Sequence, residues 1–263
     1  MINPPKLNSN RAFIVGGYSH VNPSDFTDHI SFFDSISMLL QYRYRLNPHY
    51  ALRDNEGRIA NLPYEKQREK CYQGDIEIAA HAGFLVAELT YPSTGTGQEL
   101  QAAADNNIPV VSMIRGKEGK RVDVVLRMRN HASDVEEYTL TRGEGGMSKM
   151  VDGNPAILSR IVYNDYSDAL RKLDRVLQKD LGLTPETKRL ERAAALEASA
   201  GNALKAAELR ERASLLDKLL EFNPTENTPA KYEKLFPYIR RLPLGDIEDA
   251  LKPKPANQKK IKQ

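Results

Sequence analysis

The sequence has almost no cysteine and no recognisable metal-binding motif. Its single cysteine, Cys71, excludes an internal disulfide and favours a reduced, intracellular protein. The five histidines are scattered along the chain, and no CxxC or HExxH pattern is present. We therefore expect neither a metal site nor a cofactor.

Long apolar segments are also missing. No apolar run approaches the roughly 18 residues of a membrane span, and residues 1–6 lack the hydrophobic region of a signal peptide. We expect a soluble, cytoplasmic protein that does not bind membranes.

The small net positive charge of the chain comes from one segment that contains no acid. Removing its five lysines changes the net charge from +3 to −2: Lys252, Lys254, Lys259, Lys260 and Lys262. The net positive charge of the chain therefore does not indicate a surface for specific nucleic-acid binding. We expect residues 251–263 to form a disordered basic tail.

The most informative segment of the chain is residues 84–103. Residues 84–89 are almost all apolar, as in a strand that is covered on both faces. Pro92 ends the strand, and a turn with two glycines leads into a helix that we expect over residues 97–106. Backbone N–H groups at such a helix start can bind an anion.

Two carboxylates flank this strand in the sequence. Asp75 lies on a helix predicted over residues 63–82, and Glu99 follows 24 residues later in the first turn of the next helix. Two acids beside a glycine-lined pocket suit cleavage of a glycosidic bond, because one can act as the nucleophile and the other can supply a proton. The alternatives are plain: Glu99 complements a helix dipole, and Asp75 is a surface acid.

These residues carry a family resemblance. The chain shows Asp75 before the strand, then Ala-Glu-Leu at 87–89, Pro-Ser-Thr-Gly-Thr-Gly at 92–97 and Gln-Glu-Leu at 98–100. Together with residues 11–17, this pattern resembles the nucleoside 2-deoxyribosyltransferase family. Within that family it is most similar to the branch of 2′-deoxynucleoside 5′-monophosphate N-glycosidases. The resemblance covers roughly residues 10–178.

The resemblance implies roles for individual residues. Glu99 would attack C1′ of the sugar, and Asp75, with a raised pKa, would give a proton to the leaving base. Ser93 implies a 5′-monophosphate substrate, because the family's transferases place an acid there to hold a free 5′-hydroxyl. The N–H groups of Gly95 and Gly97 would help to bind the phosphate.

The end of the first strand contributes the remaining candidate substrate-binding residues. Gly16 and Gly17 would let the sugar phosphate approach, although two glycines also form ordinary turns. Tyr18 and His20 follow them and could line the pocket.

The chain departs from the family pattern at two places. Phe13 stands where members often have a tyrosine beside the nucleophile, so Tyr18 would have to supply that hydroxyl. Residues 121–126 lack the serine with which some members bind a neighbouring subunit's phosphate.

The order of elements predicts the fold. Strands at 11–16, 84–89, 109–114 and 158–163 alternate with helical patterns, which is typical of a doubly wound, mainly parallel α/β sheet of flavodoxin or Rossmann type. We also expect a short strand near residues 50–52, a helix over 122–129 and a polar insertion over 131–156. We assign residues 1–180 to this α/β domain.

The rest of the chain reads as a helical extension. Residues 186–199 and 203–222 predict an αα-hairpin, and residues 232–250 predict one or two short helices. We assign 181–250 to this extension. It either packs on the core or contacts a partner.

These observations lead to a functional hypothesis. We expect an enzyme, an N-glycosidase that cleaves the base–sugar bond of (deoxy)nucleoside 5′-monophosphates and that forms a homo-oligomer. The alternatives are 2-deoxyribosyl transfer between nucleobases, a non-catalytic nucleotide sensor that signals through its C-terminal helices, and a structural adaptor that works through residues 186–222.

Overall fold

The computed structural model describes residues 5–18, 21–54, 59–116, 121–129, 135–144 and 146–239. His20, the predicted tail 251–263 and residues 240–250 of the predicted extension lie outside the described residues.

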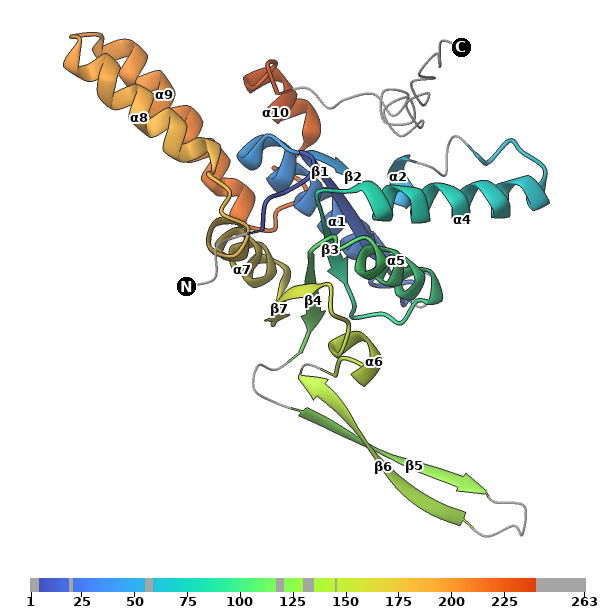
Figure 1. Cartoon of the computed structure of the whole chain (residues 1–263). Coiled ribbons are helices and arrows are strands. Elements are labelled where there is room, and N and C mark those ends of the chain that lie inside the picture. Colours follow the sequence, from blue (N-terminus) through green and yellow to red (C-terminus); the bar gives the residue numbers. More distant parts are fainter. Residues whose placement is uncertain are drawn as a thin grey trace, which may run out of the picture.

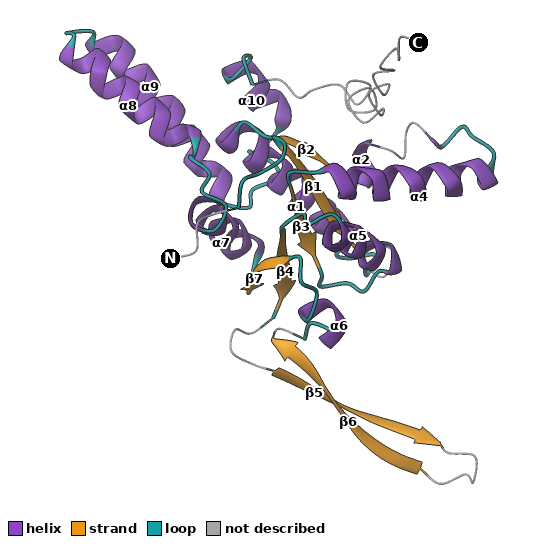
Figure 2. Cartoon of the chain, in the orientation of Figure 1, coloured by secondary structure: helices purple, strands orange, loops and turns teal. Residues whose placement is uncertain are grey.

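Five parallel strands form the central sheet in the order β2-β1-β3-β4-β7 (Figure 2). Their bounds are β1 Arg11–Gly16, β2 Asn47–His49, β3 Phe84–Glu88, β4 Val110–Arg115 and β7 Ile157–Tyr163. Counted along the chain, this is the 2-1-3-4-5 order of flavodoxin-like sheets. The predicted doubly wound parallel fold is confirmed.

Helices cover both faces of the sheet (Figure 1). One face packs against α1, its π-helical continuation η1 and α7 (Phe26–Met38, Leu39–Arg43 and Tyr166–Lys179). The other packs against α4 and α5 (Tyr64–His81 and Thr94–Asp105). Because successive strand residues point to opposite faces, β1 gives Ala12 and Ile14 to the first core and Phe13 and Val15 to the second.

The predicted helix over 122–129 is wrong. These residues form β5 (Arg121–Arg129), which pairs antiparallel with β6 (Val135–Glu144) in a separate two-stranded hairpin (Figure 2). Valines at 122, 124 and 125 favour an extended backbone, since β-branched side chains fit a strand better than a helix. The polar insertion predicted over 131–156 therefore contains a strand, followed by the short helix α6 (Lys149–Asp152).

The short strand lies earlier than predicted. It is β2, and the residues after it form the helical turn α2 (Ala51–Asp54). Pro48 cannot donate to a strand ladder, but β2 is an edge strand, where one backbone side needs no partner.

The C-terminal helices form a hairpin that is joined to the core. α8 (Glu186–Ser199) and α9 (Ala203–Asp217) pack side by side and project from the sheet (Figure 1). The chain returns through η2 (Lys218–Leu220) to α10 (Pro229–Leu235). There the buried rings of Tyr232 and Phe236 pack against Tyr42 of η1. Among the described residues, no helix has the length and apolar character needed to cross a bilayer.

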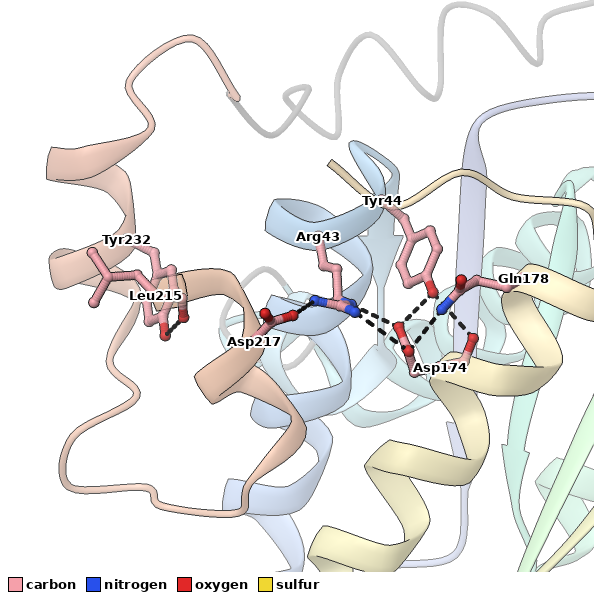
Figure 3. Close-up of polar contacts among 7 residues, drawn as sticks. All are labelled: Arg43, Tyr44, Asp174, Gln178, Leu215, Asp217 and Tyr232. Carbon is pink, nitrogen blue, oxygen red and sulfur yellow. Dashed lines mark hydrogen bonds and ion pairs between the residues drawn. The ribbon is translucent and has the colours of Figure 1, made fainter. Parts of the chain in front are cut away.

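A buried arginine connects these helices (Figure 3). Arg43 of η1 donates through Nε to Asp174 of α7 at 2.7 Å and through Nη1 to Asp217 at the end of α9 at 2.5 Å. The Tyr44 hydroxyl and the Gln178 amide also donate to Asp174. Burial lowers the pKa of Arg43, but the hydrogen bonds to Asp174 and Asp217 and the charges of these carboxylates outweigh it and raise the pKa, so the positive charge of Arg43 is retained.

We expect Arg43→Met to lower the free energy of unfolding by about 3 to 5 kcal/mol, because it leaves Asp174 buried without its cation. Urea unfolding measures this change. Arg212→Met is the matched control, since Arg212 pairs with Glu208 on the surface of α9 and such pairs contribute less than about 1 kcal/mol. Equal losses in the two variants would contradict the assignment.

Candidate functional site

The predicted site residues lie at the carboxyl ends of β1 and β3, the neighbouring strands where the strand order reverses. Gly16 of β1 is paired in register with Glu88 of β3. The chain leaves β1 toward α1 on one face, and it leaves β3 toward α5 on the other. Ligands of doubly wound sheets bind at this kind of crevice.

Glu99 reaches the site from α5. The helix begins at Thr94, three residues earlier than predicted, so Glu99 lies in its second turn and not in its first. The side chain is buried, with 8% of its residue surface exposed. A role for Glu99 that consists only of complementing the helix dipole is therefore less favoured, because the effect of the dipole fades beyond the first turn.

Asp75 reaches the same place from α4, which packs beside α5 (Figure 1). It is one of two buried residues on a mostly exposed helix, the other being Ala79. The thiol of Cys71, one turn earlier, donates to Asp75 Oδ2 at 3.5 Å. The alternative of Asp75 as a surface acid is therefore wrong.

Both carboxylates line one cavity of about 450 Å³ between α4 and α5, which Gly95 also lines. Burial, together with the negative charge of Asp75, raises the pKa of the Glu99 carboxyl to about 8. The family resemblance predicted a raised pKa for Asp75, whereas in the structure the pKa of Glu99 is raised. For two interacting acids the proton belongs to the pair, so near neutral pH the pair holds one proton and one negative charge.

Tyr18 lies close enough to the pair to interact with it electrostatically, although it is not among the residues that line the cavity. Burial raises the pKa of its hydroxyl, and negative charges on Tyr50, Glu99 and Asp75 add to the effect. Its buried oxygen has no hydrogen-bond partner within the described part of the chain. Phe13 is fully buried in the core between the sheet and α4 and α5. Of these two residues, Tyr18 is therefore the one with a hydroxyl near the acids, whereas the tyrosines that line the cavity are Tyr64 and Tyr72.

Gly16 and Gly17 serve the packing of the protein itself. A Cβ atom on Gly16 would lie 2.5 Å from Phe33 Cζ, and one on Gly17 would lie 2.6 Å from the Tyr91 carbonyl oxygen. These contacts explain why both residues are glycine without a ligand.

Gly95 and Gly97, at the start of α5, have more open surroundings than Gly16 and Gly17. Apart from the adjacent residues and the nearby backbone of α5, no atom lies within 4 Å of an added Cβ on Gly97, and only Ser93 Oγ does so on Gly95, at 3.7 Å. Ser93 is the N-cap of α5, and its Oγ accepts from the Thr96 N–H at 3.3 Å. The N–H groups of Thr94 and Gly95 have no acceptor among the described residues, which leaves them available to an anion.

One buried acid was missed as a candidate. Glu88 at the end of β3 is fully buried and accepts hydrogen bonds from the Thr90 N–H at 3.2 Å and from the Tyr163 hydroxyl at 2.8 Å. Its Oε2 lies 3.9 Å from His29 Nε2. Burial raises the pKa of Glu88 and lowers that of His29, which favours the neutral form of both. The available signal was a single charge at the end of an apolar run.

The outer part of α4 was also missed. Tyr64, Gln67, Arg68 and Tyr72 line the cavity with Asp75. Their spacing along the helix was the signal, because residues three, four and seven apart share one face. Among the described residues, no group of three His, Cys, Asp or Glu side chains could hold a metal ion.

We expect the stability advantage of Glu99→Gln to grow with pH. The unfolded carboxyl loses its proton near pH 4.5, but the folded one keeps it until about pH 8. The stability that this proton confers is complete below pH 4.5 and is lost as the pH rises through 8. Relative to wild type, the variant should gain up to about 4 kcal/mol between pH 5 and 8. Urea unfolding at several pH values measures the gain, and a difference that is constant with pH would contradict it.

Comparisons of the chain with protein-family models, with curated proteins and with solved structures found no match. The functional assignment therefore depends on the geometry of the acid pair and on the motif over residues 73–103.

Proposed function

We propose that the protein is an N-glycosidase that cleaves the base–sugar bond of (deoxy)nucleoside 5′-monophosphates. The observation that carries this proposal is the placement of Asp75 and Glu99 on one cavity, both buried and close enough for the charge of one to raise the pKa of the other. A pair that shares one proton contains both the acid and the nucleophile that glycoside cleavage needs.

In the proposed reaction an oxygen of ionised Glu99 bonds to C1′ as the bond from C1′ to the base nitrogen breaks. The electron pair of that bond stays on the base, and Asp75 supplies the proton that neutralises it. Water then attacks C1′, gives a proton back to Asp75 and releases Glu99. A 2-deoxy sugar lacks the electron-withdrawing 2′-hydroxyl, so its oxocarbenium-like transition state is easier to reach.

The start of α5 supports a 5′-phosphate on the substrate. The available N–H groups of Thr94 and Gly95 lie at the positive end of the helix dipole, next to the cavity. Ser93 adds a neutral side chain at this position, where a carboxylate would repel a phosphate.

A single cysteine is consistent with a cytoplasmic enzyme, and we propose a homo-oligomer as its working form. The family resemblance described above is part of the same proposal.

The direct test incubates the protein with a panel of deoxynucleoside and ribonucleoside monophosphates and follows the free base by chromatography. We expect Glu99→Gln to abolish base release and Asp75→Asn to slow it by about 10²- to 10⁴-fold. Glu77→Gln, an exposed carboxylate on α4, is the control and should keep full activity. The kcat/KM of wild type should fall above pH 8, where the pair loses its shared proton.

Other outcomes of this test identify other functions. Appearance of a new nucleotide when a second free base is added would indicate 2-deoxyribosyl transfer. Nucleotide binding without turnover in wild type would indicate a sensor, and the absence of binding would leave an adaptor.

We expect Ser93→Asp to lower the preference for monophosphates over nucleosides, measured as the ratio of their kcat/KM values, by about tenfold or more. Aspartate keeps the N-cap, so the fold is retained while a negative charge faces the phosphate. Ser93→Asn is the control, because it keeps the cap without a charge and should retain the preference. An unchanged ratio in Ser93→Asp would place the phosphate elsewhere.

A further inference from the structure

The cavity extends well beyond the acid pair along one face of α4. Tyr64, Arg68, Cys71 and Asp75 follow one another at intervals of three or four residues and all line it. At a rise of 1.5 Å per residue, Arg68 lies about 10 Å from Asp75 along the helix axis. The carboxylates occupy one end of the cavity, and an arginine with aromatic neighbours occupies the other.

The proposed reaction orients a substrate in this cavity. Asp75 must lie next to the nitrogen that leaves C1′, whereas Glu99 and the start of α5 lie on the side of the sugar and the phosphate. The base then extends from Asp75 along α4, toward Arg68 and Tyr64.

The groups on this part of α4 are suited to a base. Tyr64 and Tyr72 are 67% and 56% exposed, and exposed aromatic rings can stack on a base. The Arg68 guanidinium lies 5.8 Å from the centre of the Tyr64 ring. Arg68 is exposed on α4, and among the described residues its guanidinium has this ring contact but no ion pair and no hydrogen bond.

The loop that precedes α4 is attached to the helix at this end of the cavity. The side-chain amide of Gln67 donates to the carbonyl oxygens of Ala60 and Leu62, at 3.2 and 2.7 Å, which fixes the preceding loop against α4. Ile59 of that loop lines the cavity. Arg68 and Ile59 therefore line the same cavity, and the loop that carries Ile59 is attached to α4.

We propose that this face of α4 recognises the base, and that Arg68 selects 6-oxopurines. The inference rests on the proposed function. A planar guanidinium donates two parallel hydrogen bonds to O6 and N7 of a 6-oxopurine, whereas a 6-aminopurine presents a donor in place of O6. The substrate class is then the deoxyguanosine and deoxyinosine type of 5′-monophosphate.

The test compares kcat/KM for deoxyguanosine and deoxyadenosine monophosphate in wild type and in Arg68→Ala. We expect a loss of about 10- to 100-fold for the 6-oxopurine and little change for adenine. Arg68→Lys should recover only part of the loss, since an ammonium cannot form the paired contact. Lys70→Ala is the control, because Lys70 is exposed on α4 and does not line the cavity.

Two results would overturn the proposal. One is an equal loss for both bases. The other is a loss that disappears when the substrates are nucleosides, which would show that Arg68 binds the phosphate.

A calorimetric arm separates this proposal from the proposed function. If wild type releases no base from any nucleotide, the glycosidase assignment fails, and the affinities of wild type and Arg68→Ala for the same two nucleotides decide the subsite. A preference of wild type for the guanine nucleotide that Arg68→Ala loses would support base recognition on α4. Equal affinities, or no binding of either nucleotide, would overturn it.

Discussion

The site depends on the packing of α4 against α5, which holds two carboxylates out of water on one cavity. Asp75 and Glu99 are each less than one-tenth exposed, and their proximity raises the free energy of the doubly charged state. Such a pair persists only on a rigid support, since the two helices would otherwise separate to hydrate both groups. The support is the apolar layer beneath them, in which α4 contributes Ala79 and α5 contributes Leu100 and Ala103 to the core on that face of the sheet. The favourable packing of this apolar layer therefore offsets the unfavourable free energy of burying the two acids.

The opposite face of the sheet is fixed by a different kind of contact. There the Arg43 guanidinium lies between Asp174 and Asp217, so that η1, α7 and the end of α9 meet at one buried charge (Figure 3). A buried ion pair contributes little net stability relative to apolar packing, but it defines how its partners are oriented. The base of the C-terminal hairpin is thus attached to the face that carries α1, whereas the acid pair lies on the face that carries α4 and α5. Any effect of the hairpin on the site would therefore have to be transmitted through the sheet or through α1. The loop before α1 contains Gly17 and Tyr18, which follow β1.

Much of this arrangement could be predicted from local sequence, and the failures have physical causes. The parallel sheet followed from alternating apolar runs and helical spacing, and the meeting of Asp75 with Glu99 followed from their positions around one strand. The valines of residues 121–129 favour a strand, but the antiparallel hairpin β5–β6 was missed because this preference is weak until the pairing strand is known. The predicted start of α5 was too late, because the glycines at 95 and 97 suggested a turn. In the structure both glycines lie within the helix, which is capped by Ser93. Burial of Glu88, and the location of the raised pKa on Glu99, depend on three-dimensional surroundings that no local pattern contains.

The protonation of the pair bears on how such a site could work. A carboxyl whose pKa is about 8 is mostly neutral at pH 7, which by itself makes it a poor nucleophile. The same burial that keeps the proton on the pair also makes an ionised carboxylate interact strongly with a nearby positive charge, because little water screens it. An oxocarbenium-like sugar develops that charge only as the bond to the base breaks. In the proposed reaction, the negative charge on Glu99 would therefore be stabilised as the sugar becomes positive and disfavoured before that point. An interaction that strengthens in the transition state is one that accelerates a reaction.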